Sequence, residues 1–228
     1  MKKLSLLFMM SALAFGVKAQ DKDVPRFRIA VNGGYSYRIG KVPSSFSGDA
    51  RDYMKKLKSG FNVGADVQYY FNDEWGVGVK YLRFQASGSG VVAAESPSDG
   101  YMRTNVADNI GITFYGATFC GRVYTKSDYS QAFLIGASLG YMRYRDNGQV
   151  AAYPVTIKGG ALGSGLDVGY DIRIARKLYA GAQFSYLAGT VGRVTIERAG
   201  MTETRELKDD QRENLSHLSL SAGLRFHL

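Results

Sequence analysis

Cysteine and histidine are scarce in this chain of 228 residues, which has one cysteine and two histidines. The single Cys120 cannot form an internal disulfide, and we interpret it as a small packing residue. One cysteine and two histidines cannot supply the usual ligands of a structural zinc site, and pairs with metal-ligand spacing are absent. The sequence therefore excludes a disulfide scaffold and a zinc module, and we expect neither a metal nor a cofactor.

Long apolar runs are also missing. Beyond the N-terminal segment, no stretch of the sequence approaches 18 uninterrupted apolar residues, which excludes a transmembrane helix. At 45% hydrophobic and 13% aromatic residues, the chain is nevertheless too apolar to be intrinsically disordered. Its length suits one good-sized domain or two small ones, and we expect one compact domain.

The N-terminal residues 1–19 have the three parts of a secretory signal peptide. Lys2 and Lys3 give a basic start, an apolar run extends from Leu4 to Phe15, and Ala19 suits a signal peptidase. The run is too short for a spanning helix. We expect cleavage before Gln20, which leaves residues 20–228 as one domain. The alternative is a buried N-terminal helix of a cytosolic protein.

The remaining sequence is dominated by period-two alternation, the pattern of β-strands, and shows almost no helical periodicity. In one clear case, Val63, Val67 and Phe71 alternate with polar residues or glycine. Long and short connections alternate between the segments, as in an up-and-down barrel whose long loops all leave one end. The alternation predicts eight strands, at about residues 26–39, 59–71, 75–86, 109–124, 131–145, 161–175, 177–190 and 214–228.

One segment has a mixed parity. In residues 109–124, Ile110, Ile112 and Phe114 favour one face, whereas Phe119 and Val123 favour the other. A β-bulge near Tyr115 or Gly116 would reconcile the two sets. We therefore expect a bulge in this strand.

The composition of the polar face indicates which side meets lipid. That face is crowded with glycines, which weaken an exposed strand but fit the narrow interior of an eight-stranded barrel. The apolar set has aromatic residues near both strand ends, as two membrane interfaces would select. A soluble, lipocalin-like cup with an apolar interior is the alternative. The expected girdles contain Tyr69, Phe71, Trp75, Phe133 and Phe226 near the short turns, and Tyr35, Tyr37, Tyr81, Tyr141 and Tyr186 near the long loops.

Together with the terminal strand, this architecture resembles the small eight-stranded outer-membrane barrels of the OmpA/OmpX type, in the outer membrane protein beta-barrel domain group. The last strand, from Leu218 to Leu228, resembles the C-terminal signal by which the assembly machinery recognises such barrels, although Phe226 stands two places before the end and Leu228 is last. The resemblance implies an all-β fold, a closed eight-stranded antiparallel up-and-down transmembrane barrel in the bacterial outer membrane. It also implies barrel-assembly machinery and outer-membrane lipid as partners.

The inward face carries charges of both signs. Folding the second and third strands about Asp73 places Asp66 opposite Lys80 on this face. We interpret the charges as an internal brace, with a gated ion pathway as the alternative. The predicted interior ionic network contains Arg28, Asp66, Lys80, Asp167, Asp171 and Arg225.

A basic rim is expected near the long loops. The outward-facing Arg83 and Arg143 lie where the outer leaflet presents lipopolysaccharide phosphates, and guanidinium groups suit phosphate oxygens. We expect lipid-phosphate contact there, with an ordinary solvated rim as the alternative. Nucleic acid is excluded as a partner because the protein is exported and no aromatic platform accompanies the basic residues.

A catalytic reading rests on the last strand alone. His217 and Ser219 resemble the His-x-Ser arrangement of lipid A deacylase barrels, with Glu213 as the nearest acid. In those enzymes the pair faces the membrane, whereas parity here turns both residues inward. A nucleophile needs its base and an orienting acid within reach. We therefore predict that the protein is not an enzyme, and retain a lipid A acyl hydrolase as an alternative.

Taken together, the sequence predicts a monomeric integral outer-membrane barrel. Its expected role is structural, in envelope integrity, or one of surface interaction through long extracellular loops. A small passive channel of the porin-like kind is the main alternative.

Overall fold

The structure is a computed structural model that describes residues 24–40, 48–96, 100–151, 153–208 and 211–228. The predicted signal peptide, residues 1–19, lies outside the described residues. Eleven strands and one helix are present in these ranges. The elements are β1 (Phe27–Arg38), α2 (Gly48–Lys56), β2 (Ser59–Tyr70), β3 (Trp75–Ser96), β4 (Gly100–Tyr124), β5 (Gln131–Val150), β6 (Tyr153–Ala175), β7 (Leu178–Val191), β8 (Arg193–Arg198), β9 (Met201–Glu206), β10 (Glu213–Asn214) and β11 (His217–His227).

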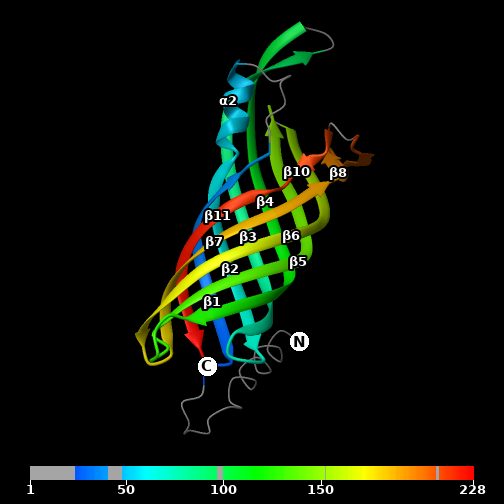
Figure 1. Ribbon diagram of the computed structural model, residues 1–228. Helices are drawn as coiled ribbons and strands as arrows, with labels where there is room; N and C mark the ends of the chain where they lie inside the picture. Colours follow the sequence, from blue (N-terminus) through cyan, green and yellow to red (C-terminus); the bar gives the residue numbers. More distant parts are fainter. Residues whose placement is uncertain (1–23, 41–47, 97–99, 152, 209–210) are drawn as a thin grey trace, which may run out of the picture.

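The strands close into an antiparallel ring with eight strand positions (Figure 1). Each of β1 to β6 pairs with the strand that follows it in the sequence, and β11 closes the ring by pairing with both β7 and β1. After Gly192, β8 continues the strand position of β7, because both pair with β6. Strands β9 and β10 share the eighth position with β11. The predicted fold class is confirmed. In the described part of the chain, no helix has the length and apolarity that a membrane crossing requires.

We refer to the two ends of the ring as the turn end and the loop end. The first described residues, the C-terminus and the short turns lie at the turn end (Figure 1). At the opposite, loop end, the β3–β4 hairpin rises furthest, with α2 beside it.

Much of the sequence expected to be loop at the loop end is strand. The expectation of loops at 87–108, 146–160 and 191–213 is wrong for most of these residues, because β3 to β6 continue through them and β8 and β9 form a further hairpin. Both faces of these extensions are polar in many rows, so their sequence lacks the apolar alternation that identifies a half-buried strand. The extensions make the loop end a folded structure.

The expected bulge near Tyr115 and Gly116 is absent. The β3–β4 and β4–β5 registers run through this region without a shift, and a register shift between strands occurs instead at Arg173 to Ala175. Ile110, Ile112 and Phe114 point inward and are buried, whereas Phe119 and Val123 point outward. The mixed parity therefore arises because the side chains that fill the lumen are polar near the turn end and apolar near the loop end.

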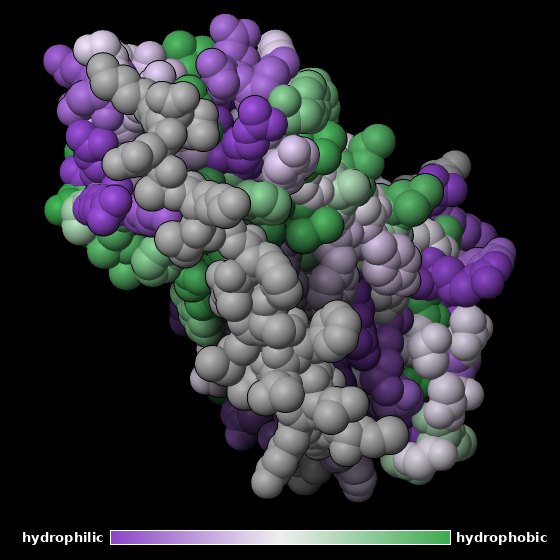
Figure 2. Space-filling view, turned by 90° about the horizontal axis from the view of Figure 1, so that it is seen from below, coloured by the Kyte–Doolittle hydropathy of each residue, from purple (hydrophilic) through white to green (hydrophobic). Residues whose placement is uncertain are grey.

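The outer surface of the ring is apolar. Val67, Leu166 and Leu220 are about half exposed, and Leu162 is 86% exposed. Most of the predicted aromatic residues also face outward, including Tyr35, Phe71 and Phe226. Figure 2, seen from below, shows hydrophobic side chains on the outer surface and hydrophilic ones gathered in separate clusters. Such a surface suits hydrocarbon and not water.

Helix α2 packs on the inner face of the β3 extension. Tyr53 and Leu57, which follows the last turn, are buried there. A Cβ atom placed on Gly90 would lie 3.0 Å from Cδ2 of Tyr53, and one on Gly88 would lie 3.1 Å from Cδ2 of Leu57. The two glycines therefore leave the room in which the helix docks.

Replacing Gly90 by valine is expected to displace α2 from the hairpin. The added methyl groups would overlap the Tyr53 ring, which is fixed by a 2.6 Å hydrogen bond from its hydroxyl to Oδ2 of Asp108. Limited proteolysis of folded protein should then cut the α2 region several times faster. Ser89→Val, an outward substitution on the same strand, is the matched control; equal cutting rates for the two variants would contradict this docking.

Candidate functional site

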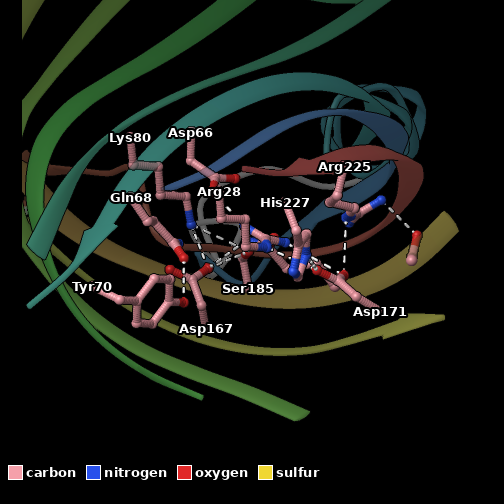
Figure 3. A network of polar contacts seen from close by, with 12 residues as sticks. Arg28, Asp66, Gln68, Tyr70, Lys80, Asp167, Asp171, Ser185, Arg225 and His227 are labelled. Atoms are coloured by element: carbon pink, nitrogen blue, oxygen red, sulfur yellow. Dashed lines mark hydrogen bonds and ion pairs between the residues drawn. The ribbon is translucent and has the colours of Figure 1, made fainter. Parts of the chain in front are cut away.

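The lumen near the turn end holds a network of charged side chains (Figure 3). Arg28 donates through Nε to Oδ2 of Asp171 at 2.8 Å and through Nη1 to Oδ1 of Asp66 at 2.6 Å. Arg225 places Nε 3.2 Å from Oδ1 of Asp171 and donates through Nη1 to the Gly181 carbonyl at 2.7 Å. Asp171 is wholly buried, so its charge is neutralised by these two guanidinium groups and not by solvent.

A second cluster surrounds Asp167. Lys80 forms an ion pair with this carboxylate, which also accepts hydrogen bonds from Ser185 at 2.5 Å and Gln183 at 3.1 Å. The predicted register of Asp66 opposite Lys80 is correct, but the two side chains do not form an ion pair with each other: Lys80 pairs with Asp167 across the lumen and Asp66 with Arg28. Register determines which side chains are neighbours on adjacent strands, whereas contacts across a narrow barrel depend on how the ring closes.

The six residues assigned to the interior from the sequence thus lie together in the lumen, three cations with three carboxylates. His227 and Tyr179 extend this set and were not anticipated. His227 Nε2 lies 3.1 Å from Oδ2 of Asp171, and its ring stacks on that of Tyr179 at a centroid distance of 3.9 Å. The parity of the last strand, which turns His227 to the same side as Arg225, was the available signal.

Nearer the loop end, the lumen is filled by apolar side chains. Phe84, Ile112, Phe114 and Met142 are wholly buried there, and the same cluster continues to Tyr53 of α2 and to Leu57, which follows this helix. Further members include Leu82, Tyr144, Leu187, Val191 and Leu215. We call this cluster the apolar plug. Within the ionic network, the space beside Arg28, Asp66 and Lys80 amounts to about 20 Å³, room for about one water molecule.

His217 and Ser219 both point into the lumen and are 1% exposed. Ser219 Oγ lies 2.5 Å from Ser36 Oγ, and His217 Nδ1 lies 2.8 Å from the Leu215 carbonyl oxygen. The nearest predicted acid, Glu213, forms an ion pair with Arg38. Within the described residues, the pair therefore has separate structural partners and is not arranged as a nucleophile with its base and acid.

A buried carboxylate lies at the loop-end mouth of the lumen, beyond the outward arginines of β3 and β5. Asp146 is 8% exposed, and Tyr144 donates to its Oδ2 at 3.4 Å. Burial, with the nearby Asp108 carboxylate, raises the pKa of Asp146 from 3.8 to about 6. The hydrogen bond from Tyr144 and then the charge of Arg38 oppose this rise in the pKa, and Glu213 adds to it.

The stability of the protein should consequently depend on pH in the weakly acidic range. A carboxyl group with a raised pKa in the folded state holds more protons when folded than when unfolded between about pH 4 and pH 6. The free energy of unfolding should therefore fall as pH rises through this window, by up to about 3 kcal/mol.

Asp146→Asn tests this directly by urea unfolding in lipid vesicles at several pH values. The variant should be more stable than the wild type at pH 7.5, by about 1–3 kcal/mol, with a flatter pH profile. Asp73→Asn, in an exposed turn, removes the same charge and serves as the control. An unchanged profile in Asp146→Asn would refute the assignment.

The outward Arg83 and Arg143 lie on two strands with β4 between them. Arg83 pairs in register with Thr113 of β4, and Thr113 with Arg143 of β5, so the three side chains form one row. Both arginines are exposed, whereas Thr113 is only 7% exposed although it points outward, which fits long arginine side chains lying over it.

Comparisons with known proteins agree with this architecture. A family model described as outer membrane protein beta-barrel domain matches residues 5–228. Among solved structures, the Neisserial surface protein A (NspA) is 17% identical with a TM-score of 0.50, and the match covers 89% of this chain and 97% of that one. A major outer membrane protein from Thermus thermophilus is 9% identical with a TM-score of 0.53, covering 88% and 98%. A search of curated proteins finds no match.

Proposed function

We infer the role of this chain from the premise that it belongs to the outer membrane protein beta-barrel domain family and so resides in the bacterial outer membrane. Barrels of this class place short turns in the periplasm and longer connections outside the cell. The turn end of this barrel therefore faces the periplasm, and the loop end is extracellular.

On this basis we propose a closed barrel with a structural and surface-presenting role. The observation that carries the proposal is the doubly filled lumen, in which the ionic network closes one part and the apolar plug the other. Ions would have to displace buried salt bridges and then cross a dry apolar layer, and both steps are costly. A passive channel is thereby disfavoured.

The loop end supports the second half of this proposal. The β3–β4 and β8–β9 hairpins are paired strands, and α2 is fixed to the first of them by Tyr53, by Leu57 and by the Arg103–Asp49 ion pair. A folded extension presents one surface to external partners, at lower entropic cost than mobile loops would. We propose that this extension is the part of the molecule that meets them.

Planar-bilayer recording of purified protein tests the closed lumen. We expect no discrete conductance steps from the wild type under voltages at which a general porin, the positive control, conducts. Reproducible single-channel steps from folded, heat-modifiable protein would contradict the proposal and support a passive channel.

We also propose a structural role for His217 and Ser219. Ser219→Ala should leave the acylation pattern of lipid A unchanged in cells that produce the protein, as measured by mass spectrometry. A change in that pattern would instead support the acyl hydrolase alternative.

A further inference from the structure

The outer face of β3 to β6 changes its chemistry in regular steps from the membrane to the exterior. Successive outward rows on these strands are separated by two residues, about 7 Å. Towards the loop end, the row of Tyr81, Tyr115 and Tyr141 is followed by the row of Arg83, Thr113 and Arg143. Aromatic rings mark the interface of a bilayer with water, so the arginine row lies at the level of lipid phosphates.

Below the tyrosine row, the lipid-facing surface is hollowed. A groove of about 840 Å³ lies against it, and a second of about 710 Å³ adjoins this one at Ala117 and Leu139. Small side chains on neighbouring strands produce the hollow. The groove walls include Ala65, Val79, Ala117, Leu139 and Leu162. The shape and apolarity of this surface suit an acyl chain.

The arginine row is positively charged without compensation by neighbours. No ion pair forms at Arg83 or Arg143 among the described residues, and the Arg83 guanidinium reaches over Gly111, with Nη2 3.7 Å from the place of a Cβ there. One row further out, Arg145 lies beside Gly111 and donates through Nε to Oδ1 of Asn147 at 3.1 Å. Three guanidinium groups thus gather on one small area, which suits the oxygens of a phosphate.

Above the arginines, the same face is polar and uncharged. Its next two rows contain serine, asparagine, glutamine and threonine side chains and border a groove of about 590 Å³. On β3 to β6, no carboxylate points outward in these rows; the first one beside them is Glu197 of β8, which is the register partner of Thr156 and pairs with Lys158. Amide and hydroxyl groups of this kind hydrogen-bond sugars. The residues concerned are Ser87, Ser89, Asn109, Asn147, Gln149 and Thr156.

We propose that this face binds one phosphorylated glycolipid of the outer leaflet. Its acyl chain lies in the groove beside Ala117, its phosphate contacts Arg83 and Arg143, and its sugars contact the amide and hydroxyl rows above. The occupant is specified by the order of the three chemistries, which matches the order of acyl chain, phosphate and glycan in such a lipid. The closed lumen plays no part in this site, so either proposal can fail without the other.

Titration of fluorescent lipopolysaccharide against folded protein in phospholipid nanodiscs tests the site. R83Q/R143Q should weaken binding about tenfold, because two charge-assisted contacts are lost. R198Q/R205Q is the matched control, since it removes the same charge from the exposed β8–β9 hairpin, where Arg198 pairs with Val155 and Arg205 with Val194, on the face of the sheet opposite Thr156. Removal of the lipid phosphates should weaken binding to the wild type by a similar factor, but should weaken binding to R83Q/R143Q much less.

Two further arms separate the parts of the ligand. Ala117→Phe fills the groove and should weaken binding severalfold, and phosphatidylglycerol, which has a phosphate but no glycan, should compete poorly. Equal affinities for wild type, R83Q/R143Q and R198Q/R205Q would overturn the proposal. Competition by phosphatidylglycerol as strong as that by lipopolysaccharide would also overturn it, because the site would then read a phosphate alone. Heat-modifiable migration confirms that each variant is folded.

Discussion

Replacing Asp171 by alanine is expected to lower the free energy of unfolding by about 3–5 kcal/mol. The substitution leaves Arg28 and Arg225 in the lumen with one carboxylate fewer, and removes the carboxylate beside Nε2 of His227. Arg28 keeps Asp66, but Arg225 keeps only the Gly181 carbonyl. A guanidinium group that is fully buried cannot recover its lost partner from solvent, so most of the cost appears as instability.

Urea unfolding of the barrel in lipid vesicles measures this loss. Asp171→Asn keeps the volume of the side chain while removing its charge, and we expect it to be destabilised as well, which separates charge from packing. Asp128→Ala breaks the Arg173 ion pair at the surface of a turn and should have little effect. If Asp171→Ala were as stable as Asp128→Ala, the network would not brace the lumen.

Replacing Phe84 by alanine is expected to cost about 3–5 kcal/mol through a different mechanism. Phe84 is wholly buried in the apolar plug, with its ring 5.5 Å from that of His217. The surrounding walls belong to a closed sheet and cannot collapse inward, so truncation leaves a cavity. A cavity in an apolar layer stays dry and costs both transfer free energy and packing.

The same unfolding measurement distinguishes packing from mere hydrophobicity at this position. Phe84→Met nearly conserves volume and should cost less than about 1.5 kcal/mol. A loss in Phe84→Ala no larger than that in Phe84→Met would show that this part of the lumen is not close-packed.

The membrane-crossing part of the fold could be predicted because a bilayer imposes a strict period of two. Strand β2 was expected at 59–71 and is found at Ser59–Tyr70, and the turn about Asp73 fixed the register of Asp66 against Lys80. The inward parity of Arg28 and Asp171 follows from the same period. Alternation thus determines which side chains share the lumen.

Two features lay beyond that pattern. The inward face was expected to be polar or glycine throughout, so Ile112 and Phe114 were interpreted as signs of a bulge when they are part of the apolar plug. Alternation weakens where both faces are apolar, and it disappears beyond the membrane where both can be polar. Pairing across the lumen, such as Lys80 with Asp167, depends on how the ring closes and leaves no local trace in the sequence.

The arginine row could likewise be predicted only in part from the sequence. Parity was enough to place Arg83 and Arg143 outward, but their alignment with Thr113, and the uncharged rows beyond, required the β3–β4 and β4–β5 registers. The groove near Ala117 depends on small residues from several strands being adjacent. These are properties of the sheet and not of any one segment.

The central claim is that one set of apolar side chains faces hydrocarbon while another fills the lumen, and residue-level photolabelling of the reconstituted protein by a reagent confined to the bilayer tests it most directly. The account predicts strong labelling of Val67, Leu166 and Leu220 with protection of Leu82, Phe84 and Ile112. Equal labelling of the two sets, or labelling of the second set alone, would contradict it.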